Sequence, residues 1–157
     1  MKTINDEILA HAENEYPKEC CGFVVNSNGR QIYIPCKNVA DDPENFFEIA
    51  PEEVAKIYIN YEPLAVVHSH PDGTSYLSTE DRHYQVNTNL DWWLVCNGEI
   101  YKYRCVPHLL GREFKHGEMD CYSLFRDSYS LAGVELPDFQ REDEWWLNNQ
   151  NLYLDNL

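Results

Sequence analysis

The sequence predicts an α/β fold in which a central β-sheet carries helices on its faces. Two hairpin signals and three stretches with apolar residues at helical spacing support this prediction. Each hairpin signal is an Asn-Gly pair, Asn28-Gly29 or Asn97-Gly98, between two short runs rich in apolar and aromatic residues. Asn-Gly pairs tolerate the positive φ angles that tight hairpin turns require.

The predicted elements follow one another along the first two thirds of the chain. The first helix has apolar residues at Ile4, Ile8, Leu9 and Ala12 and ends at Pro17, the second begins at Pro51, and the third begins after Ser78. Short apolar runs predict five strands at residues 23–26, 31–34, 64–67, 92–96 and 99–103.

The third predicted strand leads directly into His68-Ser69-His70. Side chains alternate between the two faces of a strand, so His68 and His70 point the same way and Ser69 points away. Two imidazoles on one face form a metal-ligand pair. A catalytic zinc site keeps three protein ligands and one open position, so the pair needs one further donor.

Asp81 is the candidate for that third donor. Ser78 is a predicted helix N-cap, which places Asp81 in the first helical turn, facing back toward the end of the strand. Two simpler interpretations remain open. Ser78-x-x-Asp81 is also a capping box, which explains both residues without a metal, and a His-x-His pair can belong to a surface or a core. His83, close to Asp81, either contacts the site or faces solvent.

A hydrolytic site also needs a group that takes and returns a proton. Glu19 lies in the segment Glu19-Cys20-Cys21-Gly22, just before the first predicted strand. If that strand neighbours the one ending in His68-Ser69-His70, Glu19 comes close to the metal.

Together these residues resemble the JAMM (MPN+) metalloprotease family. The family pattern is a glutamate, then His-Ser/Thr-His, seven residues, Ser, two residues and Asp, and residues 1–106 contain it at every position. The resemblance implies the JAMM fold, a zinc ion on His68, His70 and Asp81, and cleavage of peptide or isopeptide bonds. It also implies that Glu19 is the general acid and base and that Ser78 stabilises the oxyanion. The alternative is a non-catalytic assembly factor that keeps the fold for docking.

Residues 107–157 follow a different pattern. Asp120 is a predicted N-cap, and Cys121 falls in the first turn of a helix that ends at Gly133. The apolar stripe of this helix consists of Leu124, Phe125, Tyr129 and Ala132. A helix N-terminus favours a thiolate, which would make Cys121 a candidate nucleophile, although a cysteine at this position is often part of the core.

Asp120-Cys121, the segment 133–138 and Glu144-Trp145-Trp146 together resemble the start of the papain-like NlpC-type cysteine peptidases. A JAMM domain followed by an NlpC-type domain resembles the tail-tip assembly proteins of long-tailed bacteriophages. This resemblance implies tail-tip proteins as partners and peptide, isopeptide or peptidoglycan-peptide substrates. It also implies a location in the host cytoplasm during assembly and at the virion tail tip.

A papain-like peptidase needs a histidine downstream of its cysteine. Every histidine of the chain precedes Cys121. We therefore expect that the chain ends inside the second domain and that Cys121 has no peptidase activity here. The aromatic end, with Trp145, Trp146 and Tyr153, is a candidate contact surface.

Composition restricts the partners. A net charge of −15 argues against binding to nucleic acid or an anionic membrane, because phosphate binding needs clustered Lys and Arg. No apolar run approaches the roughly 20 residues of a membrane span, and the N-terminus lacks the pattern of a signal peptide. We therefore expect a cytoplasmic protein whose six cysteines are mostly buried thiols.

Overall fold

The chain divides into two units, Met1–Cys105 and Val106–Leu157, and the computed structural model describes residues 1–141. The predicted aromatic contact surface at Trp145, Trp146 and Tyr153 lies outside the described residues. The first unit contains α1 (Ile4–Glu15), β1 (Cys21–Ser27), β2 (Arg30–Cys36), α2 (Pro51–Asn60), β3 (Glu62–Ser69), α3 (Thr79–Thr88), β4 (Asp91–Cys96) and β5 (Glu99–Tyr103). The second contains α4 (Cys121–Leu131).

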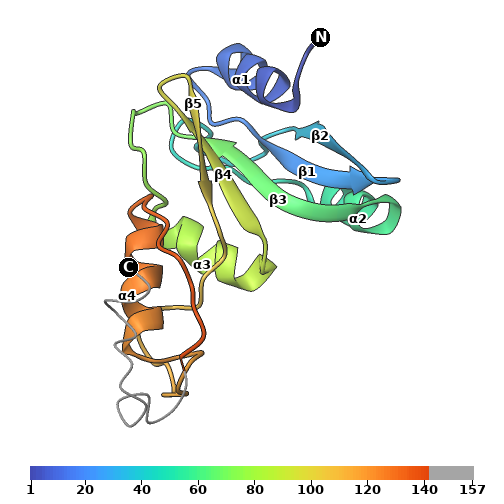
Figure 1. Ribbon diagram of the computed structural model, residues 1–157. Coiled ribbons are helices and arrows are strands. Elements are labelled where there is room, and N and C mark those ends of the chain that lie inside the picture. The colour runs from blue at the N-terminus through green and yellow to red at the C-terminus, as the bar shows by residue number, and fades with distance from the viewer. Residues whose placement is uncertain (142–157) are drawn as a thin grey trace, which may run out of the picture. The chain divides into compact units, whose positions relative to one another are not determined.

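The first unit is built on a mixed five-stranded sheet with the order β2-β1-β3-β4-β5 (Figure 1). Both predicted hairpins are confirmed, and Asn28, Gly29, Asn97 and Gly98 all have positive φ. The pair β3–β4 is parallel, and α3 forms the crossover that a parallel pair requires. β1 pairs antiparallel with β3, so the strand after Glu19 is a direct neighbour of the strand that carries His68.

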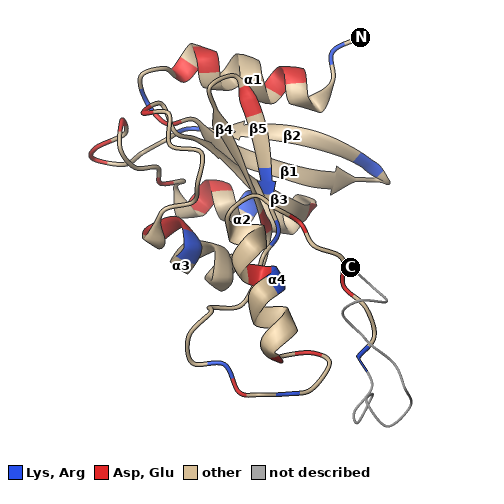
Figure 2. Ribbon diagram, turned by 60° about the vertical axis from the view of Figure 1, so that its left-hand side comes forward, with Lys and Arg blue, Asp and Glu red and all other residues tan. Residues whose placement is uncertain are grey.

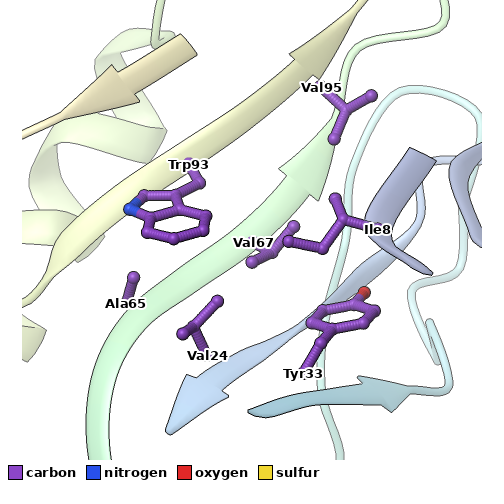
Figure 3. Close-up of a cluster of buried hydrophobic side chains, with 7 residues drawn as sticks. All are labelled: Ile8, Val24, Tyr33, Ala65, Val67, Trp93 and Val95. Atoms are coloured by element: carbon purple, nitrogen blue, oxygen red, sulfur yellow. The ribbon is translucent and has the colours of Figure 1, made fainter. Parts of the chain in front are cut away.

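One face of the sheet is covered by α1. Ile8, fully buried, packs there against side chains that alternate along the strands: Val24, Tyr33, Ala65, Val67, Trp93 and Val95 (Figure 3). The helix therefore attaches to the sheet largely through one isoleucine, with Ile4, Leu9 and Ala12 at the margin.

The opposite face carries α2 and the loop before it. Ile57 of α2 packs against the residues that alternate with those of the first core: Cys21, Phe23, Val25, Cys36, Val66 and Trp92. Phe47, Ile49 and Leu77, from the loops around the sheet, complete this second core. The sheet is thus buried on both sides, as continuous apolar strands predict.

The strand that leads to the histidines is longer than predicted, since β3 begins at Glu62 rather than Leu64 and includes Pro63. The pairing of β1 with β3 shifts register between Val24 and Val25, where Pro63 lies. Proline has no N–H to donate to the ladder, so an irregularity of this kind accommodates it.

In the second unit, α4 begins after the predicted N-cap Asp120, but its buried face differs from the predicted apolar stripe. Leu124, Phe125 and Tyr129 are each more than two-fifths exposed. The buried residues of the helix are instead Tyr122, Ser123, Asp127 and Ser130. These polar side chains can be buried because they have polar partners. Asp127, for example, forms a 2.9 Å ion pair with Arg112.

The cysteine prediction is confirmed for most positions: all six are free thiols, and Cys20, Cys21, Cys36 and Cys96 are buried. Among residues 1–141, no helix is both long enough and apolar enough to cross a membrane.

We predict that Ile8→Ala lowers the free energy of unfolding by about 2–5 kcal/mol, because it leaves a cavity between α1 and the sheet. Ile59→Ala is the matched control, since Ile59 lies on α2 but is 81% exposed, and it should change the free energy of unfolding by less than about 0.5 kcal/mol. Chemical denaturation of both variants measures the difference. Equal losses would contradict the role of Ile8 as the anchor of α1.

Candidate metal centre

The two histidines converge at the end of β3. His68 is the penultimate residue of the strand and is completely buried, whereas His70 follows the strand and has a side chain 9% exposed. Their Nε2 atoms are 3.2 Å apart. The prediction that His68 and His70 share a face is confirmed. Ser69 points away, and its Oγ accepts a 2.7 Å hydrogen bond from the backbone N–H of Cys20.

Asp81 brings a carboxylate oxygen to the same point from the first turn of α3. Its Oδ2 lies 3.3 Å from His68 Nε2 and 3.1 Å from His70 Nε2. The predicted capping box is also present: Ser78 Oγ accepts from the Asp81 N–H, and Asp81 Oδ2 accepts from the Ser78 N–H. The capping role and the position beside the histidines are therefore compatible in one side chain.

The spacing of these three atoms fits a tetrahedral zinc ion. Zinc binds histidine nitrogen and carboxylate oxygen at about 2.0–2.1 Å, which places neighbouring ligand atoms about 3.3 Å apart in a tetrahedron. The three distances in the structure are 3.1, 3.2 and 3.3 Å. Nitrogen, nitrogen and oxygen donors are also the set that zinc prefers. His68, His70 and Asp81 therefore have the chemistry and the arrangement to hold this metal.

Neighbouring groups orient both imidazole rings. His70 Nδ1 donates to the backbone carbonyl of Thr74 at 2.8 Å, which leaves Nε2 directed at the shared point. This contact is the usual second interaction of a metal-binding histidine. The ring of His68 stacks on Phe47, with centroids 4.8 Å apart, and meets the edge of Trp92 at 5.3 Å.

The charges at this point favour a cation. Burial alone would raise the pKa of Asp81, but hydrogen bonds from His68 and His70 hold it well below its usual range. Burial lowers the pKa of His68, which keeps that ring neutral. Burial also acts to lower the pKa of His70, but hydrogen bonds to Asp81 and Thr74 outweigh it, so this pKa is raised. The result is an ionised carboxylate beside two imidazoles, and a metal ion would take the place of the protons that the Nε2 atoms now direct at Asp81.

Glu19 lies next to this group, at the end of β1 nearest the histidines. It is 6% exposed, and burial raises its pKa to about 8, while the nearby His70 opposes the shift. The pairing of Cys21 with His68 continues into a bond from the Ser69 N–H to the Cys20 carbonyl. Glu19 and His70 are the next residues of the two segments; both line the same cavity, and each affects the pKa of the other.

A groove of about 1090 Å³ opens beside the centre. Glu19, His70, Ser78 and Asp81 all line it, and apolar and aromatic side chains form much of its remaining wall. Ser78 is exposed here, and because its Oγ accepts from the Asp81 N–H, its hydroxyl hydrogen remains available for a bound group. Four of the six predicted site residues thus line one cavity, and the fifth, His68, is buried beside His70 and Asp81.

The remaining residues lie elsewhere. Cys121 is the first residue of α4 in the second unit, and it is exposed rather than part of a core. His83 is exposed on α3 and is not among the residues that line the groove, which favours the solvent-facing alternative.

Sequence reasoning missed Asn38, which holds the loop of residues 39–50 against the site. Its Nδ2 donates to the carbonyls of Glu19, Pro43 and Phe46, and its Oδ1 accepts from the N–H groups of Ala40 and Glu48. A further bond joins the Glu19 N–H to the Pro43 carbonyl at 2.7 Å. The loop that carries Phe47 over His68 is therefore fixed to the backbone of Glu19. No sequence pattern marks an asparagine of this kind.

Residues 1–107 match the family of prokaryotic homologs of the JAB domain. The chain belongs to this family. The predicted α/β fold, with a sheet flanked by helices, is therefore confirmed for the JAB domain. The match ends at residue 107, so the NlpC-type segment after it stays a prediction.

The proteins that resemble the chain include two bacteriophage proteins and a solved structure. It is 60% identical over 109 residues to tail tip assembly protein K of Escherichia phage lambda, covering 69% of this chain and 55% of that protein. It is 37% identical over 162 residues to tail tip assembly protein K of Escherichia phage N15, covering 100% of this chain and 65% of that protein. The chain therefore spans less than two thirds of either relative.

The solved structure is a protein of Desulfitobacterium hafniense determined in solution. It is 24% identical to this chain and matches with a TM-score of 0.50, covering 66% of this chain and 82% of that one. At this level of identity the match describes the fold alone.

We predict that Asn38→Asp loosens the loop, because a carboxylate oxygen then replaces the amide group that donates to three carbonyls. The free energy of unfolding should fall by about 2 kcal/mol or more, and the amide hydrogens of Glu19 and Val39 should exchange faster with solvent. Asn60→Asp is the control, since Asn60 is exposed and donates only to the Lys56 carbonyl. Unchanged exchange at Glu19 in Asn38→Asp would show that the loop is held by other contacts.

Proposed function

We propose that the JAB domain is a zinc-dependent peptidase or isopeptidase, part of a bacteriophage tail-tip assembly protein. The observation that carries the proposal is the convergence of His68 Nε2, His70 Nε2 and Asp81 Oδ2 within 3.3 Å of one another, beside the buried carboxylate of Glu19. The phage setting is supported by the names of the two relatives, both called tail tip assembly protein K.

Zinc held by His68, His70 and Asp81 would polarise the substrate carbonyl and make water a nucleophile near neutral pH. Glu19 supplies the proton transfers. Its carboxylate takes a proton from the attacking water and returns it to the leaving amine, so that it is unchanged after each cycle. Burial in the wall of the groove suits this role, since it brings the pKa of Glu19 to about 8, near the pH at which the group must both accept and donate.

Ser78 is placed to assist at the carbonyl oxygen. Its Oγ is fixed by the bond from the Asp81 N–H, and its hydroxyl hydrogen can donate to the negative charge that develops on that oxygen. The capping bond thus orients the hydroxyl group that would donate to the carbonyl oxygen.

The substrates in this proposal are amide bonds, in a tail protein during assembly or in the peptide cross-links of peptidoglycan. The partners are other tail-tip proteins, in the host cytoplasm and later at the tail tip. Cys121 belongs to a separate proposal, in which it is the nucleophile of an NlpC-type peptidase. Every histidine of these 157 residues precedes Cys121, so that activity would need a histidine from outside them.

The second candidate is a docking role in which the domain holds metal without catalysis. The relatives' names favour it, since both describe assembly rather than hydrolysis. Replacing Glu19 with Gln in the phage gene separates the two roles. Undiminished yield of infectious phage would favour docking, whereas loss of phage with normal levels of folded protein would favour hydrolysis.

We predict that wild-type protein purified without chelator contains one zinc per chain, that His70→Ala loses it, and that Glu19→Gln retains it. Glu19→Gln should hydrolyse a quenched fluorescent peptide library about 100-fold to 10,000-fold more slowly, as expected for loss of a general acid and base. Elemental analysis and the peptide assay measure the two properties. Equal loss of zinc from both variants would make Glu19 a ligand and contradict the proposed roles.

We predict that Ser78→Ala and Thr3→Ala destabilise the protein by a similar amount, about 1 kcal/mol, because each removes the N-cap of a capping box. Only Ser78→Ala should also slow hydrolysis, by about 100-fold, while keeping its zinc. Ser78→Thr retains a hydroxyl and should restore both properties. If Ser78→Ala and Thr3→Ala hydrolyse the library equally fast, Ser78 is a cap alone.

A further inference from the structure

The groove beside the metal centre has a one-sided charge. Among the described residues that line it, none is a lysine or an arginine. Eight carry carboxylates: Glu19, Asp41, Asp42, Glu44, Glu48, Asp72, Glu80 and Asp81. Figure 2 shows acidic positions at the start of α3 and on loops near it. A low-dielectric wall concentrates such a field inside the groove.

Much of this charge is not neutralised within the protein. Asp81 interacts with the histidines, Asp42 accepts a hydrogen bond from Asn45, and Asp72 accepts one from the Thr74 N–H. No ion pair within residues 1–141 involves the other rim carboxylates, which are Asp41, Glu44, Glu48 and Glu80. All four are exposed, so they are available to a ligand.

Aromatic rings accompany the carboxylates. Phe46, Tyr58, Tyr76 and Tyr84 line the groove, and each is about half exposed. The faces of such rings attract ammonium and guanidinium groups, and their surfaces accept the aliphatic stems of lysine and arginine. Carboxylates and rings together therefore suit long cationic side chains.

The surroundings of Glu19 also favour a ligand, in this case one with hydrogen-bond donors. Glu19 lines the groove with only 6% of its surface exposed, and its carboxylate forms no hydrogen bond with any residue of 1–141. A largely buried carboxylate with no partner in the protein gains from a bound group that donates hydrogen bonds to it. The N–H groups of a peptide are such donors.

We propose that this groove binds a peptide segment with lysine or arginine side chains next to the bond presented to the metal centre. The inference rests on the proposed function, because it names the substrate class of the same site. A peptide fits better than a small cation, since a volume of about 1090 Å³ exceeds that of most small-molecule pockets. Acidic peptides are excluded by repulsion.

The test measures binding rather than cleavage, so it does not depend on catalysis. Three fluorescein-labelled peptides of equal length share the same apolar residues and differ in carrying several Lys, Gln or Glu residues. Their affinities for the full chain are measured by fluorescence anisotropy, with zinc added and with chelator. We expect the Lys peptide to bind at least about tenfold more tightly than the Gln peptide, with the preference declining as salt screens the charges.

Two double variants remove the same number of charges, one from the groove and one from α1. Glu44→Gln with Glu48→Gln removes two charges from the groove, and Glu7→Gln with Glu13→Gln removes two from exposed positions of α1, on the opposite face of the sheet (Figure 2). The first pair should weaken binding of the Lys peptide about fivefold or more, and the second less than about twofold.

Equal affinity for the Lys and Gln peptides would overturn the inference. Equal weakening by the groove variant and the α1 variant would also overturn it, since the Lys peptide would then be attracted to the net charge of the protein alone. Selective binding without zinc or hydrolysis would support the inference and refute the proposed enzyme. Zinc-dependent hydrolysis with no preference for the Lys peptide would support the proposed enzyme and refute the inference.

Discussion

Antiparallel pairing between β1 and β3 is the interaction on which the site depends. Cys21 pairs with His68, and beyond the last ladder pair Cys20 and Ser69 are joined twice, by a bond from the Ser69 N–H and by one to the Ser69 hydroxyl. This extension fixes Glu19 beside His70. A shift of one residue would turn every side chain to the other face and separate Glu19 from the histidines. The buried alternation on both faces of the sheet prevents such a shift.

The second constraint is the loop that Asn38 holds in place. Without it, the groove would lack the wall that contains Phe46 and Phe47, and the ring of His68 would lose its stacking partner. Asn38 acts through backbone groups, three carbonyls and two N–H groups. These bonds do not involve the side chains of the loop, so they do not restrict which side chains line the groove.

The parts of the structure set by short-range patterns were predictable from the sequence. Alternation placed His68 and His70 on one face, and the capping box placed Asp81 in the first turn of α3, because both rules involve residues fewer than five positions apart. The loop of residues 39–50 was not predictable, since its conformation depends on long-range bonds from Asn38 to irregular backbone. The stripe predicted for α4 was wrong because its inward face is polar, with Asp127 bonded to Arg112, and apolar periodicity cannot detect such a face.

Capping and metal binding do not exclude each other at Asp81, because the oxygen that accepts the capping bond is the one that lies beside both imidazoles. Oδ2 accepts from the Ser78 N–H and points at both imidazoles. The cap fixes the side chain in this position, so an ion held by Asp81 and the two histidines would cost little conformational entropy at Asp81. A free carboxylate on a mobile side chain would have to be ordered by the metal itself. Capping boxes near a His-x-His strand therefore deserve to be considered as ligand positions, because the capped geometry is the one that binding requires.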